Sequence, residues 1–255
     1  MESYNEKLNE LFDEWQKECG ITHFFQDGLM YRGEIKEDKT WRYPDKEKES
    51  KMWHDAPKRV MFLLKDVNAG DDGPEVDDDI RGRIFRDSSV RIYRNMSYWL
   101  YGLLKTIENG QIPDYTFSDA EATQFFDDTP VAYVNCKKEA GKSSVSANTL
   151  HNHLEVNQKF IIREIEFLDP DIIICCGGSS SIKNFVEKEV YTDLEKIDDS
   201  NNWIFYSKSK NKVVIDSYHP SYWQIKGGSK TIYERMMAKF KEFLDKYPDF
   251  KNSCR

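Results

Sequence analysis

The stretch Leu168-Asp169-Pro170-Asp171-Ile172-Ile173-Ile174-Cys175-Cys176-Gly177-Gly178-Ser179 decides the fold class of this chain. Its apolar centre, residues 172–176, predicts a strand that is covered on both faces of a sheet. The residue before a proline avoids the helical region, so Asp169-Pro170 ends the helix that we expect over 150–168. A further helix is expected over 179–188. Helix, strand and helix in this order are typical of α/β proteins.

The same arrangement, an apolar run followed by polar residues, recurs along the chain. Four further strands are expected, at residues 60–64, 131–135, 203–206 and 212–216, the last two as a hairpin. Apolar residues at helical spacing predict three more helices, over residues 3–19, 91–107 and 229–246. Strands that alternate with helices imply a mainly parallel central sheet, so we expect a three-layer α/β/α sandwich.

The segments between these elements are expected to be loops. They comprise an irregular region at 20–59 with an exposed charged loop at 36–51, an acidic loop at 68–79, and loops at 109–129 and 139–149. We therefore expect two parts in the chain. Residues 1–59 form an N-terminal helix and an irregular extension, which packs on an α/β core formed by residues 60–255.

Composition sets limits on the class of protein. The chain has 255 residues, 39% hydrophobic and 32% charged, which is enough for one sizeable core under a very polar surface. No apolar stretch approaches the ~20 residues that span a bilayer, and the N-terminus lacks the parts of a signal peptide. Two of the five cysteines lie inside the strand at 172–176. We expect reduced core thiols, no contact with membranes, and a cytoplasmic location.

The histidines and cysteines do not have the spacing of a metal site. His151 and His153 are two residues apart, which does not turn both toward one ion on a helix. The cysteine spacings fit neither an iron–sulfur cluster nor a structural zinc. We expect no metal and no cofactor.

Polar residues follow the predicted strands. Asp66, Asn135, Gly177 and His219 each come shortly after an apolar run. In an open α/β sheet, ligands bind outside the carboxyl ends of the parallel strands. We therefore expect these four residues to converge on one crevice.

Three of the segments after the strands resemble the uracil-DNA glycosylase superfamily, in the order of that family. They are Lys65-Asp66-Val67-Asn68-Ala69, Asn135-Cys136-Lys137-Lys138 and His219-Pro220-Ser221-Tyr222. The third matches the His-Pro-Ser of the family, and residues 168–174 resemble its approach to the next strand. Gly82-Arg83-Ile84-Phe85 resembles the family's Gly-Arg-Pro-Phe. The first segment lacks the glycines and the proline of one branch, and the chain lacks that branch's iron–sulfur cysteines.

The resemblance spans about residues 60–225 and implies the fold of that family. It also implies an enzyme that hydrolyses the N-glycosidic bond of uracil or a damaged pyrimidine in DNA. His219 would stabilise the departing base, and Asp66 would orient the attacking water. The base-binding residues would be Asn135, Phe85 and Lys138, and the DNA-contacting residues Ser221, Tyr222, Lys137 and Lys142.

Each of these residues also has a purely structural interpretation. Asn135 can cap a loop, Phe85 can be a core aromatic, and Asp66 and His219 can hold local hydrogen bonds or ion pairs. Two further functions therefore stay open: a non-catalytic relative that binds nucleic acid or a nucleobase, and a glycosidase for free nucleosides or nucleotides.

The net charge of -8 bears on the choice among these functions. Phosphate binding depends on Lys and Arg, and three basic groups can offset the charge, at residues 81–94, at residues 137–142, and at Lys226 with Lys230. We expect any DNA binding to be weak and strongly salt-dependent. A free nucleobase or nucleoside would be tolerated better.

Overall fold

The computed structural model describes residues 3–21, 24–39, 41–68, 79–84, 90–141, 146–177, 179–222 and 224–252. Within these ranges, seven strands form one sheet in the order β1-β3-β2-β4-β7-β6-β5. The strands are β1 (Gly28–Leu29), β2 (Val60–Asn68), β3 (Val131–Gly141), β4 (Ile172–Cys176), β5 (Leu194–Lys196), β6 (Ile204–Ser207) and β7 (Lys212–Ser217).

The sheet is mixed. The pairings β2–β3, β2–β4 and β4–β7 are parallel. The pairings β1–β3, β6–β7 and β5–β6, which extend the sheet on both sides, are antiparallel. Parallel pairing is therefore confined to the four central strands, and the sheet as a whole is mixed, not mainly parallel as expected. β6 and β7 form the expected hairpin.

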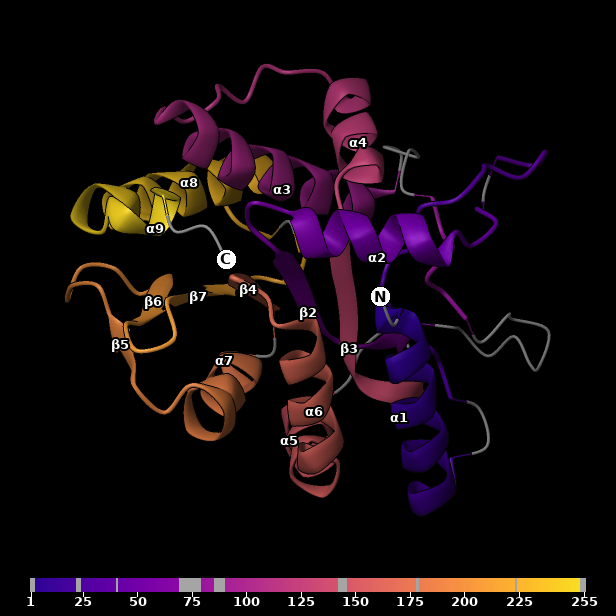
Figure 1. Cartoon of the computed structure of the whole chain (residues 1–255). Coiled ribbons are helices and arrows are strands. Elements are labelled where there is room, and N and C mark those ends of the chain that lie inside the picture. Colours follow the sequence, from indigo (N-terminus) through magenta and orange to yellow (C-terminus); the bar gives the residue numbers. More distant parts are fainter. Residues whose placement is uncertain are drawn as a thin grey trace.

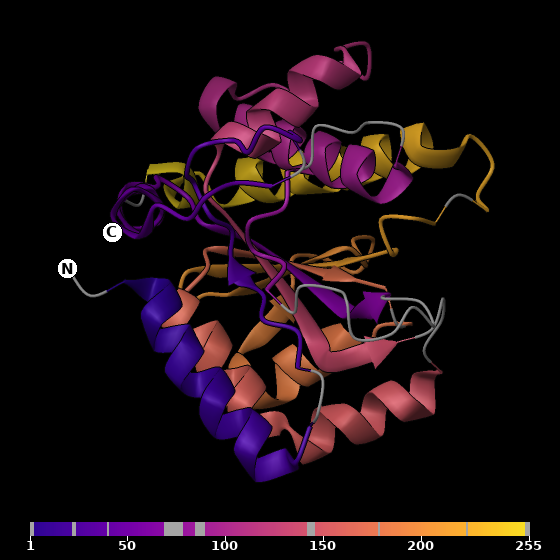
Figure 2. The ribbon, with the colours of Figure 1, turned by 90° about the vertical axis from the view of Figure 1, so that its right-hand side faces the viewer.

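Helices cover both faces of the sheet. They are α1 (Tyr4–Cys19), α2 (Lys46–Asp55), α3 (Arg91–Asn109), α4 (Asp119–Asp128), α5 (Ala147–Val156), α6 (Gln158–Leu168), α7 (Ser181–Phe185) with a π-helical turn at Val186–Val190, α8 (Gly228–Lys246) and α9 (Asp249–Asn252). Figure 1 shows α3, α4 and α8 on one side of the sheet and α1, α5, α6 and α7 on the other. The view at right angles shows the sheet between these layers (Figure 2).

Successive side chains of the central strands point to opposite faces of the sheet, so each face has its own hydrophobic core. In β2, Phe62 and Leu64 pack with α3 and α8, whereas Met61 and Leu63 pack with α1 and α6. All four side chains are buried. A strand that is covered on both faces has a continuously apolar sequence. The strands at 60–64 and 172–176 can therefore be predicted from the sequence alone.

Three expected loops contain regular structure instead. The segment 109–129 holds α4, whose first turn is capped by Ser118 through the backbone N–H of Glu121. The charged segment 36–51 runs into α2, which Asp45 caps in the same way. Caps of this kind favour a helix even where the apolar pattern is weak. β3 also continues past 135 to Gly141 by pairing with the end of β2.

The helix expected over 150–168 is two helices, because Asn157 interrupts it. The Asn157 side-chain oxygen accepts hydrogen bonds from Trp15 Nε1 at 2.6 Å and from Cys19 Sγ at 3.2 Å. The residues of α1 that make these contacts are 138 or more positions away in the chain. The interruption of the helix therefore cannot be predicted from the sequence around Asn157. In the described part of the chain, no helix has both the length and the apolar character needed to cross a bilayer.

Candidate functional site

The strand register sets the geometry of the sheet edge. Leu64 pairs with Asn135, Leu63 with Cys175, and Cys176 with Ser217. Residues 64, 135, 176 and 217 therefore form one row across the four parallel strands. With about 4.8 Å between neighbouring strands, this row spans about 14 Å. Asp66, Gly177 and His219 follow the row, so all four expected residues lie along one sheet edge. The expected convergence on one crevice is not found, because the cavity at this edge is lined by Gly177 and His219 but not by Asp66 or Asn135.

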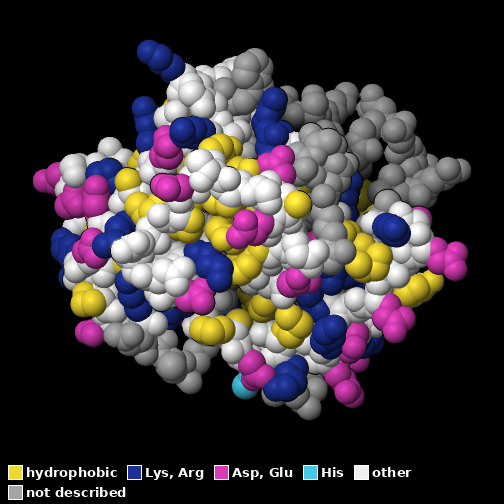
Figure 3. Space-filling model, turned by 90° about the horizontal axis from the view of Figure 1, so that it is seen from above, with side chains coloured by type: hydrophobic (Ala, Val, Ile, Leu, Met, Phe, Trp, Pro, Cys, Tyr) yellow, Lys and Arg dark blue, Asp and Glu magenta, His cyan; other side chains and the backbone are white. Residues whose placement is uncertain are grey.

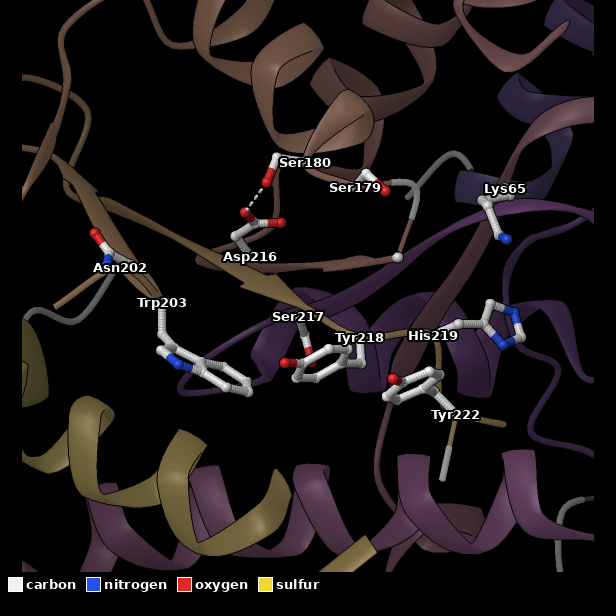
Figure 4. Close-up of a pocket in the computed structure, with 11 residues that line it drawn as sticks. Lys65, Ser179, Ser180, Asn202, Trp203, Asp216, Ser217, Tyr218, His219 and Tyr222 are labelled. Carbon is white, nitrogen blue, oxygen red and sulfur yellow. Dashed lines mark hydrogen bonds between the residues drawn. The ribbon is translucent and has the colours of Figure 1, made fainter. Parts of the chain in front are cut away.

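A cavity lies at this edge, where the strand order reverses. β2 is flanked by β3 on one side and β4 on the other, and ligands of open α/β sheets bind at such a switch point. The cavity measures about 520 Å³, and its lining includes Lys65, Ser180, Trp203, Asp216, Tyr218 and His219. Figure 4 shows Lys65 and His219 at one end and Trp203 at the other. We name it the His219 cavity.

His219 is held in one protonation state. Its Nδ1 accepts a hydrogen bond from the Ser221 backbone N–H at 3.2 Å, and the Ser221 hydroxyl oxygen lies 2.7 Å away. Nδ1 is therefore unprotonated, and the neutral ring carries its proton on Nε2. Burial, helped by the charge of Lys65, lowers the pKa of His219 to about 4. At neutral pH the side chain is an uncharged donor.

The turn that carries His219 is fixed by its neighbours. Asn95, buried on α3, donates a hydrogen bond from Nδ2 to the Pro220 carbonyl oxygen. The Tyr222 backbone N–H donates to the His219 carbonyl oxygen at 2.8 Å. Gly177 has a φ of +90°, and a Cβ placed there would lie 3.1 Å from the His219 backbone nitrogen. This close approach requires glycine.

Aromatic rings form one side of the His219 cavity. Tyr218 and Tyr222 stack at 4.9 Å with an interplanar angle of 7°, and Trp203 meets Tyr218 edge-on at 5.7 Å. Facing them, the Ser180 hydroxyl donates to Asp216 Oδ2 at 2.5 Å (Figure 4). Burial raises the pKa of Asp216, and the Ser180 hydrogen bond and the charge of Lys183 oppose this shift.

Asn135 lies on the β3 side of the edge in a different environment. It has no exposed surface. Asp27 Oδ2 accepts hydrogen bonds from its backbone N–H at 2.7 Å and from its Nδ2 at 2.9 Å. Among the described residues, its Oδ1 has no hydrogen-bond partner. A buried acceptor without a partner costs about 1–3 kcal/mol, so this oxygen is the group of Asn135 that a donor would stabilise most.

Lys138 has a structural environment, not the one expected of a base-binding side chain. Its ammonium group pairs with Asp27, and with Glu164 at 2.7 Å, and none of these three side chains is exposed. Burial alone would lower the pKa of Lys138, but the two carboxylates raise it. We name Asp27, Asn135, Lys138 and Glu164 the Asp27 cluster. Lys138 acts on Asn135 only through Asp27.

Asp66 and Lys137 lie beside each other on β2 and β3. Burial raises the pKa of Asp66, against the charges of Lys137 and Lys65. Lys137 is only 14% exposed and lies 3.7 Å from a Glu139 carboxylate oxygen. Little of its charge faces solvent, which reduces its value as a DNA contact. Asp66 does not line the His219 cavity.

The other expected site residues divide into two groups. Ser221 and Tyr222 lie on the His219 turn, and Ser221 is exposed. Phe85 and Lys142 lie outside the described residues.

In the basic segment 81–94, Arg81 is buried and paired with Asp79 at 2.8 Å. On the face seen in Figure 3, Lys and Arg side chains are intermixed with Asp and Glu and form no continuous basic surface.

Sequence reasoning missed several residues of this edge. Asp27 precedes the two-residue strand β1, which has no readable pattern, and Asn95 lies within a helical stripe. Asp216, however, ends an apolar run that was identified as a strand, so its polar character was a usable signal. No three His, Cys, Asp or Glu side chains of the described segments are grouped as metal ligands would be.

Comparison with protein-family models finds none that matches this chain, and comparison with curated proteins finds no significant match.

Proposed function

We propose that this protein hydrolyses the N-glycosidic bond of uracil or a damaged pyrimidine in DNA, with a fold of the uracil-DNA glycosylase type. One observation carries the proposal: a neutral histidine at the switch point of the sheet. His219 uses Nδ1 for Ser221, and no described residue is hydrogen-bonded to its Nε2. That N–H is the donor which a departing base anion needs.

The chemistry assigns a role to each group. Water attacks C1′ of the sugar, the C1′–N1 bond breaks, and its electron pair leaves with the base. His219 Nε2–H stabilises the negative charge on the base, an effect of the oxyanion-hole type worth about 2.7–4 kcal/mol per donor. Asp66 orients the water and takes its proton. Protonated His219 would be the stronger donor, but its low pKa keeps it neutral.

Asn135 is suited to recognise the base. Uracil presents a donor at N3 and an acceptor at O4. The free Oδ1 of Asn135 can accept from N3–H, and the second hydrogen on Nδ2 can be donated to O4. Asp27 fixes the orientation of the Asn135 amide group, because a carboxylate can accept a hydrogen bond from Nδ2 but not from Oδ1.

The test is release of uracil from DNA by the purified chain. Single-stranded and duplex oligonucleotides with one uracil are the substrates, and free uridine is the third. We expect release from DNA, and a loss of about 10²–10⁴-fold in Asp66→Asn if Asp66 is the base. Asp13→Asn, at an exposed position on α1, is the matched control.

The other outcomes decide between the remaining functions. Release from uridine alone would contradict the proposal in favour of a nucleoside glycosidase. Release from no substrate, together with binding of uracil, would contradict it in favour of a non-catalytic binding protein.

A further inference from the structure

We propose that the His219 cavity is a subsite for a nucleobase that carries an exocyclic amino group, either in a single-stranded nucleic acid or in a free nucleotide. The inference rests on the proposed function in one respect. It places this second base beside the one that His219 releases. The two bases would lie on opposite sides of His219, since Asn135 is on β3 and the cavity extends along β7 toward β6.

The aromatic side of the cavity supplies the stacking surface. Trp203, Tyr218 and Tyr222 come from the start of β6 and from the turn after β7, and they form a continuous series of ring contacts. Tyr218 is 37% exposed, so part of its ring is accessible from solvent. Stacking of one base on such a ring is worth about 1–3 kcal/mol, or about 5–150-fold in affinity. It accepts any base.

The polar side of the cavity supplies selectivity. Asp216 is the one carboxylate among the described lining residues, and it lies across the cavity from the rings (Figure 4). Ser180 occupies one acceptor position on Oδ2, and a carboxylate has about four. The free positions accept from an amino group, as carboxylates do from N4 of cytosine. They repel the O4 that uracil and thymine present instead.

Size and access agree with this assignment. A volume of about 520 Å³ is within the range of about 300–1,000 Å³ of small-molecule sites. Lys65 at the His219 end places a positive charge where the phosphate of the same nucleotide would lie. A base in a duplex is stacked and paired, so only an unpaired base can enter. The cavity therefore predicts a preference for single strands.

The first experiment measures binding of uracil-free ligands to the wild-type chain at low salt. The ligands are fluorescent single-stranded dC and dT 12-mers, the duplex of a mixed-sequence 12-mer, and free CMP and UMP by calorimetry. We expect dC to bind about 5–150-fold more tightly than dT, and the duplex more weakly than either strand. A preference for CMP over UMP without binding of strands would assign the subsite to free nucleotides.

Variants separate stacking from selectivity. Tyr218→Ala should weaken dC and dT alike, by about 5–150-fold. Tyr43→Ala, at a ring that is 57% exposed outside the cavity, is the matched control. Asp216→Asn keeps an acceptor for Ser180 and should remove the preference for dC. Thermal unfolding followed by circular dichroism confirms that each variant is folded.

Equal binding of dC and dT by the wild type, or an unchanged preference in folded Asp216→Asn, would overturn the inference. Asp66→Asn, a change at a residue outside the lining of the His219 cavity, separates its failure from failure of the proposed function. That variant should keep the dC preference, whether or not the wild type releases uracil. A chain that prefers dC but releases no uracil keeps the subsite and loses the proposed reaction.

Discussion

On the β3 side of the sheet edge, the Asp27 cluster holds three ionisable side chains with no exposed surface, whereas on the β7 side the His219 cavity is open and holds its histidine uncharged. Charges position Asn135, and neutral hydrogen bonds and aromatic packing position His219. Removing one member of a buried charged group leaves the others unpaired. Removing a member of an open site leaves a group that water can reach. The two sides should therefore fail differently: the first by unfolding, the second by losing function.

The largest expected effect is on the Asp27 side. Asp27→Ala leaves Lys138 with Glu164 alone and removes the acceptor of Asn135, so it should lower the free energy of unfolding by about 3–5 kcal/mol. Urea denaturation measures this, with Asp13→Ala on the exposed side of α1 as the control. A loss of only about 0–1 kcal/mol, as for a surface ion pair, would remove the distinction between the two sides.

His219→Ala should show the opposite pattern. If the chain releases uracil, this change should lower the rate by about 10²–10³-fold, the usual effect of losing one such donor, while the urea midpoint stays close to that of the wild type. Ser221→Ala is the matched variant, because it keeps the backbone N–H that fixes the ring. A large loss of rate in Ser221→Ala as well would show that the hydroxyl, and not the backbone, sets the ring's protonation.

Gly177→Ala should have an intermediate effect on both stability and function. A left-handed φ costs an alanine about 1–2 kcal/mol, and the new Cβ would also press on the His219 backbone. Gly110→Ala is the control, since Gly110 has a φ of +73° but its nearest contact is the flexible end of Lys251 at 3.4 Å. Uracil release and urea denaturation are compared for the two variants. An identical loss in both would mean that the approach to His219 is not tight.

The smallest expected effect at neutral pH is that of the two histidines with a lowered pKa, because their influence on stability appears only as the pH falls below about 6.5. Burial lowers the pKa of His219 and of His153 from 6.5 to about 4. Between these values the unfolded chain binds protons that the folded chain does not, so stability should fall as the pH is lowered from 6.5 through 4. The double change of His219 and His153 to Gln should reduce this fall in urea titrations between pH 4 and 7. An unchanged slope would show that the folded state protonates these rings freely.

The sequence predicted the sheet better than its surroundings, for a physical reason. The strands at 60–64 and 172–176 are buried on both faces, so every residue had to be apolar and the pattern was unambiguous. α4 and the interruption at Asn157 depend instead on caps and on contacts with α1. Such contacts join residues far apart in the chain, and the local pattern does not record them.

The candidate site divides in the same way. His219, Asp66 and Asn135 were found because they follow readable strands. Lys138 was expected to bind the base, because a lysine after a strand usually faces solvent. Its acidic partners, Asp27 just before β1 and Glu164 on α6, are far away in the sequence and could not be foreseen. Asp27 and Asn95 were missed for lack of any local signal.

The two outer strands of the sheet have a consequence for the protein at high concentration. β1 has two residues, and β5 has three, of which Glu195 and Lys196 are exposed and charged. An exposed strand edge is a template on which another chain can add a strand, and short or charged edges resist this. Both ends of this sheet therefore resist such growth, which helps to protect its long apolar central strands from edge-to-edge aggregation.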